Sequence, residues 1–271
     1  MPQKAFRFGV VAGANDAAGW LATARRAEEL GYSTLLCPDS LEMPTPTAAL
    51  AAAAAATTEL RVGSFVLASP LRTARAAAWE AHSLTVVTSG RFELGLGTGR
   101  PEMRQQAGEL GLPYGSGQER LDSISETVDH VRRLDGDAHT PVMIAAGGPK
   151  VRRLAGAKAD IVALAGGPLT TREEMAGHVG EIREAAGDRD VELSLNIWAV
   201  GEHVPPWIRG FLGVDAETLA EHDSLAMLRG SADDMAAELE RRREELGVSY
   251  VSVNGAFLEE FAPVVALLSG K

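Results

Sequence analysis

Cysteine is nearly absent from this 271-residue chain, in which Cys37 is the only one. A single cysteine cannot form an intrachain disulfide or a thiolate cage around a metal ion. The six histidines, at positions 82, 130, 139, 178, 203 and 222, lack the paired spacing of zinc ligands. We therefore expect no bound metal.

Lysine is also scarce, and none of its four positions lies in a predicted strand: 4, 150, 158 and 271. An aldolase that forms a Schiff base needs a desolvated lysine at a strand end, so this chemistry is excluded. The chain also lacks the Gly-x-Ser-x-Gly turn of serine hydrolases and the Walker loop of nucleoside triphosphatases.

Positive charge is in deficit, with 26 Lys and Arg against 37 Asp and Glu and a net charge of −11. Nucleic acids and anionic membranes bind basic surfaces, so we expect neither as a partner. The alanine run at 48–56 is too short to span a bilayer, and no signal-peptide pattern precedes the first strand. We expect a cytoplasmic protein with a small-molecule substrate.

What the chain does contain is a regular alternation of two-residue and 3.6-residue apolar periods. The predicted strands are 6–11, 34–37, 60–68, 91–96, 142–146, 161–164, 191–200 and 250–254. The predicted helices are 18–30, 47–57, 74–88, 118–134, 149–157, 171–186, 231–246 and 258–268. Eight strand–helix units predict one (β/α)8 barrel domain over 1–271, with irregular insertions after strands four and seven. A doubly wound open sheet is the alternative.

Glycines end two successive strands, in the segments 91–100 and 141–149. Glycine on one face of a strand lets another backbone or a flat ligand approach closely. In the second segment, the backbone N–H groups around Gly147 and Gly148 open a helix, and a helix start attracts phosphate. Thr98 and Gly99, at the neighbouring strand exit, would complete a phosphate cradle.

Several polar residues are predicted to point into the barrel. They are Ser194 and Asn196 from strand seven, and Ser252 and Asn254 from strand eight. They indicate a site, although mutual hydrogen bonds among them would explain them equally well. Glu93 should lie near the amino-terminal end of the barrel, in an ion pair with Arg7 or Arg61.

Four segments resemble the bacterial luciferase-like monooxygenase superfamily: 24–39, 60–69, 83–99 and 236–253. The most specific is Thr88-Ser-Gly-Arg-Phe-Glu-Leu-Gly-Leu-Gly-Thr-Gly99, and the last segment is similar to the branch that uses the deazaflavin coenzyme F(420). The resemblance implies a barrel that holds F(420) or FMN at the carboxyl ends of its strands.

The resemblance also implies where the cofactor and a second subunit bind. A bulge with a non-proline cis peptide, here near Phe65–Val66, would support the ring, and Thr98, Gly99, Ala146, Gly147 and Gly148 would contact the phosphate. Family members commonly dimerise through the region of helices 47–57 and 74–88, so a homodimer is expected. Asn196, Trp198 and Trp207 are predicted substrate contacts, with Trp207 in a stiff segment that walls or covers the site.

The chain departs from the family at its acid–base positions. Ser40 follows Asp39 where the family commonly has a catalytic histidine, and Arg100 follows Gly99 where deazaflavin dehydrogenases often have an acidic glutamate. Asp39 and Arg100 are therefore the candidates for polar catalytic roles, with Glu102 a further one. Arg100 would bind a substrate carboxylate or the acidic tail of a deazaflavin.

Three functions remain open from the sequence. The first is an oxidoreductase or monooxygenase that uses a flavin or deazaflavin for hydride transfer or oxygen activation. The second is a flavin-binding protein of the same fold that has lost catalysis. The third, a phosphate-sugar isomerase or aldolase on the same barrel, is the least favoured because the strand ends carry no suitable lysine or His–Glu pair.

Overall fold

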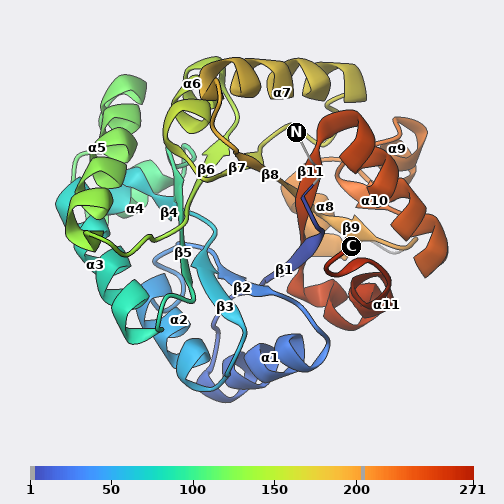
Figure 1. The fold of residues 1–271 in the computed structure, drawn as a ribbon, viewed down its shortest axis with the longest axis horizontal. Coiled ribbons are helices and arrows are strands. Elements are labelled where there is room, and N and C mark those ends of the chain that lie inside the picture. The colour runs from blue at the N-terminus through green and yellow to red at the C-terminus, as the bar shows by residue number, and fades with distance from the viewer. Residues whose placement is uncertain (1–3, 203–204) are drawn as a thin grey trace.

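The chain folds into a closed parallel barrel surrounded by helices, seen down its axis in Figure 1. This computed structural model describes residues 4–202 and 205–271. The barrel strands are β1 (Arg7–Val11), β2 (Thr34–Cys37), β3 (Arg61–Ser64), β4 (Leu67–Ala68), β5 (Phe92–Gly97), β6 (Val142–Ala146), β7 (Ile161–Leu164), β8 (Glu192–Ile197) and β11 (Val248–Asn254). A pairing between β3 and β5 closes the ring, which confirms the predicted (β/α)8 architecture and excludes the open sheet.

In the described part of the chain, eight helices cover the outside of the barrel (Figure 1). They are α1 (Ala17–Glu29), α2 (Pro46–Ala55), α3 (Ala74–Val87), α5 (Gly117–Asp135), α6 (Pro149–Lys158), α7 (Arg172–Ala186), α10 (Ala232–Leu246) and α11 (Leu258–Leu268). Pro149 opens α6, and Gly31, Gly187 and Gly247, each just past the end of a helix, have positive φ angles. Among the residues described, every helix is too short or too polar to cross a membrane.

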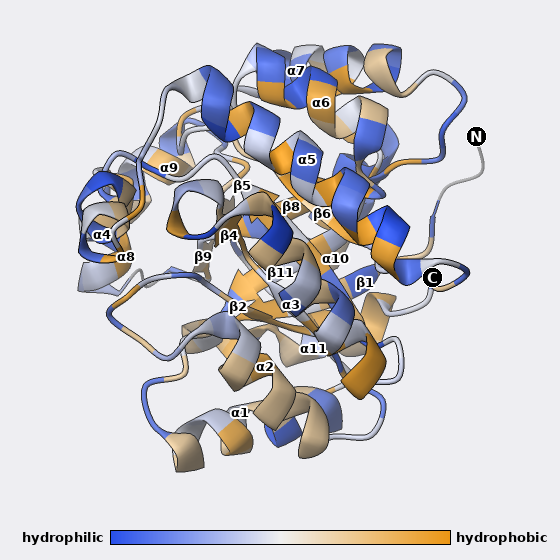
Figure 2. Ribbon diagram, turned by 90° about the vertical axis from the view of Figure 1, so that its left-hand side faces the viewer, coloured by the Kyte–Doolittle hydropathy of each residue, from blue (hydrophilic) through white to orange (hydrophobic). Residues whose placement is uncertain are grey.

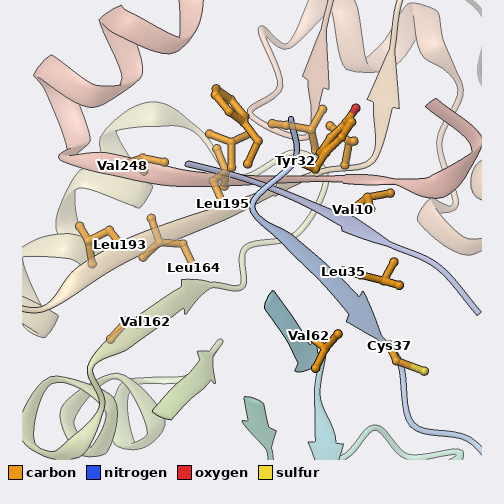
Figure 3. Packing of buried hydrophobic residues seen from close by; sticks show 14 of the residues in the cluster. Val10, Tyr32, Leu35, Cys37, Val62, Val162, Leu164, Leu193, Leu195 and Val248 are labelled. Carbon is orange, nitrogen blue, oxygen red and sulfur yellow. The ribbon is translucent and has the colours of Figure 1, made fainter. Parts of the chain in front are cut away.

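The apolar core lies between the strands and the helices. Figure 3 shows Val10, Leu35 and Val62 in this layer, on β1, β2 and β3, and the same layer continues through β7, β8 and β11. Most helices that cover it carry mixed polar and apolar residues, whereas α2, built largely of alanine, is mostly tan (Figure 2). The residues that alternate with this layer point into the barrel.

Apart from β9 (Ala199–Val200), which lies at the end of the predicted strand 191–200, the insertions contain regular structure that the sequence did not predict. After β5 lies α4 (Met103–Glu109), and after β8 come β9, α8 (Pro206–Leu212), α9 (Ala216–Glu221) and β10 (Met227–Leu228). Two 3-10 turns, η1 (Ser69–Leu71) and η2 (Gly255–Phe257), complete the chain. The expectation that the insertion after the seventh predicted strand is irregular was therefore wrong, since residues 206–212 form α8. Figure 2 shows α4, α8 and α9 at one end of the barrel and both chain termini toward the other.

Candidate functional site

A cavity of about 650 Å³ opens at the carboxyl ends of the barrel strands. Its walls come from the loops after β2, β5, β6 and β7 and from the insertion after β8. This is the end at which barrels of this architecture carry their active sites. A smaller cavity of about 480 Å³ lies at the opposite end, among the last residues of α7 and α10 and the start of β8.

A bulge between β3 and β4 forms part of the cavity lining. The predicted strand 60–68 is interrupted there by a cis peptide bond at Phe65–Val66, where the family resemblance predicted one, and both side chains line the cavity. The glycines of β5 make room for this bulge: a Cβ on Gly95 would overlap the carbonyl oxygen of Ser64, and one on Gly97 would lie 2.6 Å from Val66 Cγ2. These two glycines therefore accommodate neighbouring backbone and side chain.

The barrel interior below the cavity contains both apolar and polar side chains. Leu36, Met143, Ile161, Ala163 and Tyr250 form a small inner cluster. Ser252 Oγ donates to Asn196 Oδ1 at 2.9 Å, so two of the predicted inward polar residues satisfy each other. Asn254 Oδ1 instead accepts from the backbone of Ala256, and Ser194 Oγ is buried with no partner among the described residues. Of these four residues, Asn196 and Asn254 line the cavity.

Charged residues fill the amino-terminal end of the barrel. Glu93 Oε1 accepts from Arg7 at 2.8 Å and from Arg61 at 2.7 Å, which confirms the predicted structural ion pair. Burial alone would lower the pKa of Arg7, but Glu93, with Glu192, outweighs burial and raises that pKa. Burial, together with the nearby charge of Glu93, raises the pKa of Tyr250 as well. These groups lie outside the cavity lining.

Asp39 lines the cavity, but an arginine already binds it. Arg72 Nη1 donates to Asp39 Oδ2 at 2.7 Å, and Arg72 Nη2 donates to Asp39 Oδ1 at 3.1 Å. The backbone N–H of Ala68 also donates to this carboxylate. Asp39 therefore ties β2 to the segment after the bulge, with its charge balanced. Burial raises the pKa of the adjacent Cys37 thiol to about 12, so this thiol is protonated at neutral pH.

The predicted phosphate cradle is only partly on the cavity wall. Thr98, Gly99 and Gly147 line the cavity, whereas Ala146 belongs to the outer core layer of β6. Gly148 is the N-cap of α6, has no side chain to cap that helix, and has no atom within 4 Å of the position of an added Cβ. The first turn of α6 thus keeps backbone N–H groups without a capping side chain.

Aromatic side chains form the wall on the side of the insertion. Trp198, Trp207 and Phe211 line the cavity, and the rings of Trp198 and Phe211 stack with their centroids 4.5 Å apart. The guanidinium of Arg100 lies over the Phe211 ring at 4.5 Å from its centroid. Glu102 does not line the cavity, and His203 lies outside the described residues.

Two residues of the site were missed from the sequence, Arg72 and Phe211. Arg72 follows the 3-10 turn η1 and carries no motif of its own, so only the fold brings it to Asp39. Phe211 belongs to a segment whose aromatic residues suggested packing or closure, but that pattern did not single it out. The only sequence signal for Arg72 was its place close to a predicted strand end, and the only one for Phe211 was its aromatic ring.

These features define a (β/α)8 barrel protein with a mainly apolar ligand cavity at the carboxyl ends of its strands. The chain belongs to the luciferase-like monooxygenase family, whose profile matches residues 5–202. The family predicted from the sequence is thereby confirmed.

Individual proteins are similar to this chain over different extents. The F(420)-dependent glucose-6-phosphate dehydrogenase of Intrasporangium calvum is 30% identical over 166 residues, which is 50% of this chain and 50% of that protein. The solved F(420)-dependent secondary alcohol dehydrogenase, in complex with an F(420)–acetone adduct, has a TM-score of 0.77 at 17% identity over 97% of this chain and 98% of that one. The oxygenating constituent of 3,6-diketocamphane monooxygenase from Pseudomonas putida, in complex with FMN, has a TM-score of 0.74 at 12% identity over 98% of both chains. At identities of 17% and 12%, the likeness to these two solved structures shows a shared fold alone.

Proposed function

We propose that this protein is an oxidoreductase or monooxygenase that uses F(420) or FMN on a small organic substrate. The observation that carries the proposal is the cavity itself. In a chain of the luciferase-like family, it lies at the carboxyl ends of the strands and has the Phe65–Val66 bulge in its lining. The similarity to an F(420)-dependent dehydrogenase favours F(420), and the fold shared with an FMN complex keeps FMN as the alternative.

The residues present fit such a cofactor. The planar ring of the cofactor would rest against Phe65 and Val66. The phosphate of the cofactor would reach Thr98, Gly99 and Gly147 on the cavity wall. The uncapped start of α6 at Gly148 supplies backbone N–H groups and a positive dipole end for that phosphate. The bound cofactor would supply the hydride or the activation of oxygen, while the protein positions it and excludes water.

The remaining wall would hold the substrate. Asn196 offers an amide, Trp198 and Trp207 offer apolar surface, and Arg100 offers a cation at the mouth. Asp39 would act by positioning, since Arg72 holds its carboxylate, and this departs from the catalytic role expected from the sequence. Among the described residues of the lining, Asp39 is the only carboxylate and no histidine, lysine or tyrosine is present.

This shortage of acid–base groups favours a second candidate, a flavin-binding protein that has lost catalysis. Ser40 stands where the family commonly has a histidine, and it is absent from the cavity lining. The two candidates differ in turnover and share the cofactor site. Steady-state assays with reduced F(420) and reduced FMN would separate them: bound cofactor without turnover on any acceptor supports the second.

The cofactor site is tested by titrating the protein with F(420) and FMN and following absorbance and fluorescence. Gly148→Asp should abolish binding of the preferred cofactor, because its carboxylate would lie against the phosphate. The variant should keep its fold, since an added Cβ meets nothing within 4 Å. Gly177→Asp, on α7 and equally open, is the matched control and should bind normally. Unchanged binding by Gly148→Asp would contradict the assigned phosphate position.

We also propose a homodimer formed through α2 and α3. On α3, Trp79 is 70% exposed, Val86 62% and Val87 70%. Large apolar side chains at this exposure along one helix are typical of an interface. Location in the cytoplasm and the extent of the domain over 1–271 stay predictions from the sequence.

A further inference from the structure

Three side chains from three separate segments meet at the mouth of the cavity. Trp198 follows β8, Phe211 lies on α8, and Arg100 lies between β5 and α4. The Phe211 ring contacts both of the others, with its centroid 4.5 Å from that of Trp198 and 4.5 Å from the guanidinium carbon of Arg100. An indole and a guanidinium thus border a volume that one phenyl ring fills.

Phe211 is only lightly held in that volume. Phe211 is 45% exposed, and Ile208 is the one residue of α8 that is fully buried. A phenyl ring on the surface of a helix can turn into solvent by rotating about its side-chain bonds, without unfolding the helix. Trp198 is held more firmly, because it is half-buried and packs against the main apolar core.

The charge around this volume is positive. Asp39 and Arg100 are the charged residues of the described cavity lining, and Arg72 neutralises Asp39. The guanidinium of Arg100 makes no hydrogen bond or ion pair with any described residue, so its contact is the Phe211 ring. A guanidinium with free donors at the mouth of an otherwise apolar cavity attracts an anion, above all a carboxylate.

We infer that the volume filled by the Phe211 ring is a subsite for a planar aromatic group of the substrate that carries an acidic substituent. The ring of the substrate stacks on Trp198 in place of Phe211, and Arg100, released from Phe211, pairs with the acidic group. Phe211 then acts as an occupant that leaves when the substrate enters. The inference rests on the proposed function, because it names the substrate class of the same cavity.

The test uses 2-naphthoate as the probe and measures its dissociation constant by isothermal titration calorimetry. Phe211→Ala should bind it about tenfold more tightly, because no ring has to be displaced. Arg100→Met should bind it about tenfold more weakly, because the cation is lost. Leu110 is exposed and lies outside the cavity lining, so Leu110→Ala is the control. It should bind 2-naphthoate with the dissociation constant of the unmodified protein.

Two further probes separate the ring from the charge. 2-Naphthylmethanol, which keeps the ring, and cyclohexanecarboxylate, which keeps the acid, should each bind more weakly than 2-naphthoate. The inference would be overturned if cyclohexanecarboxylate bound as tightly as 2-naphthoate. It would also be overturned if Phe211→Ala bound 2-naphthoate more weakly than the unmodified protein, or if neither variant changed the dissociation constant of 2-naphthoate. Should Phe211→Ala unfold, Phe211→Leu gives the same comparison without a flat ring.

Titrations with F(420) and FMN on the same proteins separate this inference from the proposed function. The naphthoate titrations use protein without cofactor, so they report on the subsite even if no cofactor binds, in which case the proposed function alone fails. Cofactor binding together with failed naphthoate predictions would refute the subsite alone. Loss of F(420) binding in Arg100→Met, with naphthoate binding unchanged, would assign Arg100 to the cofactor and overturn the inference.

Discussion

At the scale of single residues, the site is held by contacts between side chains that lie far apart in the chain. Asp39 illustrates this, since the sequence made it a candidate for a polar catalytic role and the fold gives it a bidentate partner. Burial lowers the pKa of Arg72, but the hydrogen bonds and charge of Asp39 outweigh burial and raise it. The Arg72 guanidinium therefore stays charged at neutral pH, and it holds the Asp39 carboxylate in place through two hydrogen bonds.

Arg72→Met is expected to destabilise the protein by about 3 kcal/mol, because it leaves the buried Asp39 carboxylate without its partner. Urea unfolding followed by circular dichroism measures this change. The double variant Asp39→Asn/Arg72→Met should lose less than the sum of the two single variants, since the pair acts as a unit. Additive losses would indicate that the pair does not stabilise the fold.

Single residues were also where prediction from the sequence failed. The glycines of β5 signalled a close approach, and the structure identifies the approaching atoms as those of Ser64 and Val66. Phe211 and Arg72 could not be assigned, because their contacts arise only once separate loops meet at the mouth of the barrel. Glu93 could be assigned, since the strand period put it inside the barrel, where it needed a cation.

At the scale of elements, the barrel strands and the outer helices could be predicted because each carries its own periodic pattern. The predictions for β2, β6, β7 and α11 match the structure residue for residue. The helices of the insertion after β8 could not be predicted in this way, because α8 has only seven residues and α9 only six. Helices this short are unstable alone and depend on tertiary contacts that no local pattern encodes.

One such contact joins the insertion to α10. Arg242, fully buried on α10, donates to Leu225 O at 2.8 Å and to Met227 O at 2.9 Å, and Leu225 lines the cavity. Glu238, one turn earlier on the same helix, binds Arg172 and Arg242 at 2.6 Å each. This cluster therefore anchors one wall of the cavity.

Glu238→Gln should destabilise the protein by about 3 kcal/mol at pH 7, because it removes a carboxylate shared by three arginines. Burial alone would raise the pKa of Glu238, but the arginines outweigh burial and lower it. Its stabilisation is thus complete above the unfolded-state pKa of about 4.3 and is lost as pH falls through the lower folded-state value. The difference from the unmodified protein should shrink below that pH in urea unfolding. Glu240→Gln, on the same helix and exposed, should show neither effect.

At the scale of the whole molecule, the apolar surface of α3 sets an expectation for assembly. Trp79→Glu should convert the proposed dimer into monomers, because it puts a charge into an apolar interface. Light scattering at micromolar concentration measures this change. Leu169→Glu, which alters an exposed apolar residue on the loop before α7, should leave the dimer intact. A monomeric unmodified protein would refute the interface.

The central claim is that the cavity at the carboxyl ends of the strands holds the redox cofactor. A crystal structure of the protein loaded with F(420) or FMN tests it most directly. The account predicts the ring against the Phe65–Val66 bulge and the phosphate between Thr98 and the first turn of α6. A cofactor bound elsewhere, above all in the cavity at the opposite end of the barrel, would contradict it.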